Sequence, residues 1–93
     1  MKPSELMLKG YAMAGGKQCC GQYFEGDGRN PTAVCALGAM NLAKNGDASD
    51  DFYTLRQTMV IRWHALFGFG IADANDKGML IEDIAGILAS EGM

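Results

Sequence analysis

The stretch Asn30–Gly46, NPTAVCALGAMNLAKNG, predicts a helix with a start signal and a stop signal. Asn30 can accept a hydrogen bond from a free amide of the first turn. Pro31 suits the first helical position, where no amide partner is needed. Lys44 favours the negative end of the helix dipole, and Gly46, or Asn45, can adopt the left-handed conformation that closes a helix. Both ends of the segment therefore predict the same element.

One side of this predicted helix consists of small residues and a cysteine. Three- and four-residue spacing places four side chains there: Cys35, Gly38, Ala39 and Leu42. Small side chains let another backbone approach closely. We expect Cys35, Gly38 and Ala39 to act as packing residues, against the long helix predicted at residues 52–67 or against a second copy of the chain.

The longest predicted helix follows the loop after Gly46. Ser49 suits its cap, and the acidic pair Asp50 and Asp51 suits its first turn. Apolar residues then recur at helical spacing over Phe52–Phe67, with Trp63 among them. We expect this helix to face the core along its whole length and to be stopped by Gly68 and Gly70.

Two further helices and one short extended element complete the expected fold. A helix is predicted over Ser4–Ala14, capped by Ser4, and another over Met79–Ser90. Residues 18–24 read as an extended segment, and the EGDG run at 25–28 as a turn. The sequence thus predicts one domain over residues 1–93. It is mainly α, a compact bundle of about four helices with a small irregular or β-hairpin element near residues 18–27.

Composition narrows the class of protein. The 93 residues are 48% hydrophobic and only 20% charged, which favours a folded domain over a disordered one. The net charge is −3, and no two of the eight Lys and Arg residues are adjacent, which disfavours nucleic-acid binding. No apolar run approaches the ~18–20 residues of a membrane span. Three cysteines do not make a secreted disulfide framework, so we expect a cytoplasmic protein with reduced thiols.

The candidate chemical groups are three cysteines and one histidine. A structural zinc site prefers four ligands in close pairs, and the adjacent Cys19 and Cys20 suit such a pair poorly. We therefore expect neither a metal nor a cofactor, and keep a small zinc-binding module as one alternative. A thiol nucleophile is another: Cys20 or Cys35 would need His64 beside it as a base.

The run Asp73–Gly78, DANDKG, partly follows a calcium-binding loop. Its match fails at Lys77, which occupies a ligand position, and at Ile84, which stands where a bidentate Glu belongs. Short polar side chains in such a run hydrogen-bond nearby amides. We expect Asn75 and Asp76 to fix this turn or line a pocket there, and to cap the last helix.

The order of motifs resembles a family of small bacterial and phage proteins of unknown function. That family combines a G-W-C-x-G-like segment, a C-A-L-G-A helix and a W-N-D turn before a final amphipathic helix. The corresponding segments here are GKQCCGQY at 16–23, CALGAM at 35–40, AND at 74–76 and IEDIAGIL at 81–88. Two family tryptophans are replaced, one by Lys17 or Gln18 and the other by Ala74.

The resemblance implies a helical fold and assigns no reaction. It nominates four positions for a site: Cys20, Cys35, Asn75 and Asp76. We expect a non-enzymatic interaction or regulatory protein, of phage or mobile-element origin, that binds a protein partner or itself as a homodimer. The alternatives are a cysteine-dependent hydrolase or transferase using Cys20 or Cys35 with His64, and the zinc module.

Overall fold

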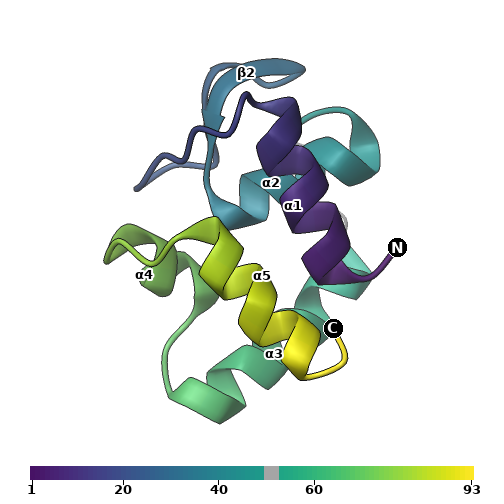
Figure 1. The fold of residues 1–93 in the computed structure, drawn as a ribbon, viewed down its shortest axis with the longest axis vertical. Coiled ribbons are helices and arrows are strands. Elements are labelled where there is room, and N and C mark those ends of the chain that lie inside the picture. Colours follow the sequence, from purple (N-terminus) through teal and green to yellow (C-terminus); the bar gives the residue numbers. More distant parts are fainter. Residues whose placement is uncertain (50–52) are drawn as a thin grey trace.

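The computed structural model describes residues 1–49 and 53–93, and the side chains from residue 57 onward in the second range. These residues form five helices and a two-stranded antiparallel sheet. The elements in chain order are α1 (Pro3–Met13), β1 (Phe24–Asp27), β2 (Asn30–Val34), α2 (Ala36–Asn45), α3 (Tyr53–Phe67), α4 (Ile71–Asp76) and α5 (Ile81–Ser90). Figure 1 places the sheet beside α1 and α2 at one end and α3 at the other. The prediction of a mainly helical fold with a small hairpin is confirmed at that level.

The prediction of one helix over Asn30–Gly46 is wrong in its first half. Residues 30–34 form β2, which pairs antiparallel with β1 so that Phe24 faces Val34 and Asp27 faces Asn30. Pro31 and Ala33 are buried on alternate positions of this strand, the period of a half-buried β-strand. Proline is tolerated because the ladder is irregular beside it, with a register shift between Glu25 and Gly26.

The second half of that prediction is confirmed. Helix α2 begins after Cys35, whose backbone is extended and whose sulfur accepts a hydrogen bond from Gly38 N at 3.4 Å. Cys35 is therefore the N-cap residue, not a mid-helix residue. Gly46 ends the helix at φ 75°, and its amide donates to the Leu42 carbonyl at 2.9 Å.

The hairpin lies later in the chain than expected. Its strands occupy residues 24–34, and its turn is at Gly28 and Arg29, not over 25–28. The segment before it runs along the other edge of β2, because Val34 N donates to Lys17 O and Cys19 N donates to Val34 O, both at 3.0 Å. Tertiary pairing on both edges of β2 thus holds residues 30–34 extended.

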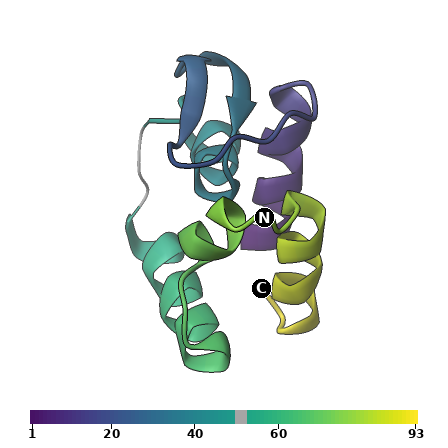
Figure 2. The same ribbon diagram turned by 90° about the vertical axis from the view of Figure 1, so that its left-hand side faces the viewer.

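The small-residue face of α2 packs against α1, not against α3 as predicted. A Cβ atom added at Gly10 of α1 would overlap the carbonyl group of Ala39, so the two backbones touch at this crossing. A Cβ atom at Gly38 would overlap the carbonyl of Tyr23 in the same way. Figure 2 shows α1 alongside α2, and α3 reaching the opposite end of the molecule. Gly10 therefore determines that α1 is the packing partner of α2. Because it has no side chain, the backbones of the two helices can touch.

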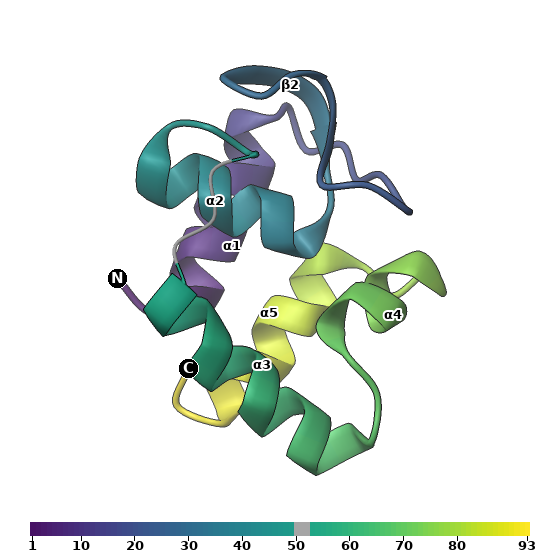
Figure 3. The same ribbon diagram turned by 180° about the vertical axis from the view of Figure 1, so that it is seen from behind.

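Helix α3 faces the core over only part of its length. Met59 and Trp63 are fully buried, as predicted, but Ile61 is 67% exposed, Leu66 49% and Phe67 41%. Its last turn lies at the end of the molecule opposite to the sheet (Figure 3). Gly68 follows at φ 76°, in agreement with the predicted end.

The predicted start of this helix lies outside the described residues. It comprises Asp50 and Asp51, predicted for the first turn, and Phe52, predicted for the apolar stripe. The hydroxyl of Ser49, the predicted cap, donates to Asp47 Oδ1 at 2.6 Å within the preceding turn.

The remaining helices differ from prediction at their ends. Helix α1 is capped at Lys2, while Ser4 is buried and its amide donates to the Met93 carbonyl at 2.9 Å. Leu80 is the exposed N-cap residue of α5 and does not belong to its apolar stripe. Helix α4 lies between the last two predicted helices, where no helix is predicted, and raises the helix count above the expected four among the described residues. None of the described helices has the length and apolar character needed to cross a membrane.

Candidate functional site

Asn75 lies at the centre of the region that the sequence nominated. Helix α4 places it fully buried, between the 17–23 segment and the start of α2. Its Oδ1 accepts hydrogen bonds from Ala36 N at 3.0 Å and from Gln18 Nε2 at 2.9 Å. Its Nδ2 donates to the Cys19 carbonyl at 2.8 Å. One side chain therefore joins three segments that are far apart in sequence.

Gln18 extends this network to the last helix. Its Nε2 also donates to the Met79 carbonyl, and its Oε1 accepts from Ile81 N, the first amide of α5, both at 2.8 Å. The prediction that Asn75 and Asp76 cap the last helix is therefore wrong. Their side chains point back to the 18–21 segment, and Gln18 satisfies the free amide instead. No local signal marks Gln18 for this role, because its partner lies 63 residues away.

Cys20 and Asp76 fasten the loop to α4 at the surface. The exposed Cys20 thiol lies 3.3 Å from the Asn75 carbonyl and 3.8 Å from its Nδ2. Asp76 Oδ1 accepts a hydrogen bond from Gly21 N at 2.8 Å. Asn75 and Asp76, predicted to fix a local turn, therefore lie in a helix. Their side chains bond segments that are far away in the sequence. Gly78 ends the run at φ 98°.

A small pocket opens beside this network. It has a volume of about 140 Å³ and is lined by Gly21, Gln22, Tyr23, Cys35, Ala72 and Asp76. Cys35 and Asp76 face it directly, and Asn75 and Cys20 adjoin it through the hydrogen bonds above. The structure therefore gathers the four nominated positions in one place.

The three thiols differ in environment. None of the three forms a disulfide; Cys20 is exposed, and Cys19 and Cys35 are buried. Burial, and after it the nearby Cys35 and Glu25, raises the pKa of the Cys19 thiol to about 11. Cys19 therefore stays protonated at neutral pH, and a protonated thiol is a poor nucleophile.

His64 does not join this site. It lies exposed in the last turn of α3. Figure 3 shows that turn at the end of the molecule opposite to the hairpin, away from the first turn of α2 where Cys35 lies. The thiol–imidazole pairs considered from sequence, Cys20 or Cys35 with His64, are not brought together. Within residues 1–49 and 57–93, no three His, Cys, Asp or Glu side chains are grouped so that they could hold a metal ion.

A second feature lies at the end of α3, where aromatic rings run from the core to the surface. The ring centroids of Trp63 and Phe67 are 4.7 Å apart, and those of Phe67 and Phe69 are 6.0 Å apart. The Lys77 ammonium lies 5.6 Å from the centroid of the Phe69 ring, within cation–π range. The indole Nε1 of Trp63 is buried and has no hydrogen-bond partner in the part of the chain that the structure describes.

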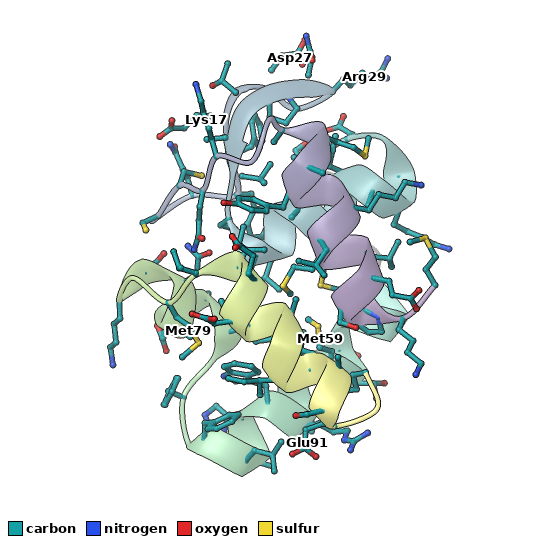
Figure 4. The ribbon with its side chains drawn as sticks, viewed as in Figure 1. Lys17, Asp27, Arg29, Met59, Met79 and Glu91 are labelled. Atoms are coloured by element: carbon teal, nitrogen blue, oxygen red, sulfur yellow. The ribbon has the colours of Figure 1, made fainter. Side chains whose placement is uncertain are left out.

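One hydrogen bond joins α3 to the C-cap of α5. Arg62 Nη2 donates to the backbone carbonyl of Glu91, the C-cap residue of α5, at 3.2 Å. Figure 4 shows Glu91 at the lower end of α5 and Met59 behind that helix, inside the molecule. The sequence of α3, YTLRQTMVIRWHALF, contains two arginines and the histidine but no acidic residue, in a chain with eleven.

Sequence reasoning assigned Trp63 to packing and did not single out the end of α3 as a surface. The sequence does contain a signal for such a surface, because the predicted helix has apolar residues on opposite sides. Ile61 lies opposite Met59 and Trp63. No protein-family model matches the chain, and no curated protein and no solved structure is significantly similar to it. The resemblance to the family of small bacterial and phage proteins therefore stays a prediction.

Proposed function

We propose that this protein is a cytoplasmic interaction domain that binds another protein through the end of α3. We call this surface the aromatic end and define it as Leu66, Phe67, Phe69 and Lys77. The observation that carries the proposal is the exposure of Leu66 and Phe67, at 49% and 41%, next to a ring cluster that continues into the core. Single exposed apolar residues are ordinary, whereas adjoining ones mark binding surfaces.

Charge indicates the chemistry of the partner. Helix α3 has no acidic residue, and Arg62, His64 and Lys77 lie on or beside the aromatic end. Exposed Asp73 and Asp76 are the acidic residues nearest to Lys77 in sequence, and Asp76 Oδ1 accepts a hydrogen bond from Gly21 N. The proposed partner is an acidic segment with apolar anchors, because complementary charge guides association while apolar side chains supply the affinity.

The Asn75 network supports a structural role for the pocket in this proposal. Both polar atoms of its side chain are engaged with Ala36, Gln18 and Cys19. The hydrolase or transferase alternative requires a base beside the thiol, and the sole histidine lies on the last turn of α3. The favoured function is therefore binding, with the network holding α2, α4 and α5 in register.

The test uses two fluorescein-labelled peptides of about 18 residues, long enough to form a helix on binding. Both place leucine at positions i, i+3, i+4 and i+7; one carries glutamate elsewhere, and the other lysine. Anisotropy gives the affinity, and Trp63, the sole tryptophan, reports binding near its ring. We expect the glutamate peptide to bind and the lysine peptide to bind at least about tenfold more weakly, a difference of ~1.4 kcal/mol.

Two single substitutions test whether the peptide binds at the aromatic end. Phe67→Ser should weaken the glutamate peptide at least about tenfold, as expected for a central anchor. Met13→Ser is the matched control, because Met13 is 51% exposed on α1. Equal binding of both peptides, no binding of the glutamate peptide, or equal loss in both variants overturns the proposal. A doubled mass in light scattering that Phe67→Ser returns to one chain would identify a second copy as the occupant and would also overturn it.

A further inference from the structure

The aromatic end contains a buried donor without an acceptor. Trp63 is fully buried, and its Nε1 has no hydrogen-bond partner among the described residues. Buried indole N–H groups in proteins usually have a partner, because an unpaired donor has lost its hydrogen bond to water. This donor therefore destabilises the unbound state, and a bound acceptor would remove that penalty.

Phe67 packs against this indole from the last turn of α3. It follows Trp63 by four residues, so both side chains lie on the same side of the helix. The rings are tilted by 46° with centroids 4.7 Å apart, and Phe67 itself is 41% exposed. Phe67 therefore contacts the indole and is also accessible to a partner.

We infer that Trp63 Nε1 is a hydrogen-bond donor of the docking site. A bound acidic segment would displace the Phe67 ring and place an oxygen atom against the indole N–H. Its apolar side chains would cover Leu66, and its remaining carboxylates would face Lys77. The Lys77 ammonium lies 5.6 Å from the centroid of the Phe69 ring, which adjoins the Phe67 ring. This inference rests on the proposed function, because it names the atom through which the same surface recognises its partner.

Nuclear magnetic resonance provides the first arm of the test. With one tryptophan in the chain, a ¹⁵N-labelled sample gives a single indole N–H signal. Addition of the glutamate peptide should move the indole proton downfield, as a new hydrogen bond to oxygen does. The Phe67 ring protons should shift in the same titration. A saturating titration that leaves the indole proton unmoved overturns the inference.

The second arm removes the donor and keeps the ring. In a chemically synthesised chain, Trp63→benzothienylalanine replaces the indole N–H by sulfur at nearly the same size. We expect the affinity for the glutamate peptide to fall about tenfold, equivalent to ~1.4 kcal/mol. The Tm of the unbound variant should not fall, because an unpaired buried donor has been removed. A ring with a packing role alone would leave the affinity unchanged.

The outcomes separate the two proposals. If the glutamate peptide binds wild type and the benzothienyl variant equally, the inference fails and the proposed function stands. If it binds neither, both fail. A lower affinity accompanied by a lower Tm would show general damage to the site and would also overturn the inference.

Discussion

Replacing Asn75 by alanine removes the side chain that joins the 17–23 segment, α2 and α4. Three hydrogen bonds of 2.8–3.0 Å disappear together. Gln18 keeps its bonds to the Met79 carbonyl and the Ile81 amide. The Ala36 amide and the Cys19 carbonyl belong to buried residues and lose the partner that Asn75 supplies.

The expected cost follows from those two groups. A buried polar group left without a partner costs about 1–3 kcal/mol, so the two together cost about 2–6 kcal/mol. For a domain of this size, each kcal/mol lowers Tm by about 4–8 °C. Asn75→Ala should therefore lower Tm by at least about 8 °C. That loss is a large share of the ~5–15 kcal/mol that stabilises a typical domain.

Urea unfolding followed by Trp63 fluorescence measures this loss, because the buried indole becomes exposed on unfolding. Asp76→Ala is the matched control: it removes one exposed hydrogen bond, to Gly21 N, and should cost no more than ~1.5 kcal/mol.

Asn75→Asp adds a pH test. A buried carboxyl facing the Cys19 carbonyl has a raised pKa and can donate only when protonated. Its deficit should be smallest below the unperturbed Asp pKa of about 3.9 and should grow as pH rises. Equal losses for Asn75→Ala and Asp76→Ala would refute the role of the network.

Further substitutions test the close packing, the cap and the thiols. Gly10→Ala should destabilise by at least about 1–3 kcal/mol, because its Cβ meets the α2 backbone. Gly86→Ala in α5, with open space around it, should stabilise by about 0.5–1 kcal/mol; thermal melts that rank them the other way would contradict the helix crossing. Cys35→Ala should cost about 0.5–2 kcal/mol, whereas Cys35→Ser keeps a capping acceptor; equal losses would contradict the N-cap assignment. Iodoacetamide at pH 7 should label Cys20 first, as mass spectrometry of digests can check, and rapid labelling of Cys19 would contradict its burial. Because the pKa of Cys19 is raised from 9.0 to about 11, its contribution to stability is complete below about pH 9 and is lost between about pH 9 and 11.

Four residues of the candidate site could be named from the sequence, but Gln18 and the way the site is built could not. A motif resemblance nominated Cys20, Cys35, Asn75 and Asp76, and these residues lie together around one pocket. The sequence offered no way to see that Asn75 binds the start of α2, because that pairing spans 39 residues. His64 was grouped with the cysteines because it is the sole histidine, and its place at the far end of α3 depends on how the helices pack.

Local chemistry alone determined several features of this protein. Gly46 and Gly68 end helices at positive φ, and Met59 and Trp63 face the core, because helix closure and helical periodicity depend on nearby residues. The state of residues 30–34 was decided by tertiary structure. An Asn-Pro pair suits the start of a helix, but hydrogen bonds to β1 and to the 17–19 segment hold these residues as a strand. The partner of α2 was decided in the same way, by Gly10 of α1. Both outcomes depend on contacts between distant segments, and such contacts form only when the whole chain folds.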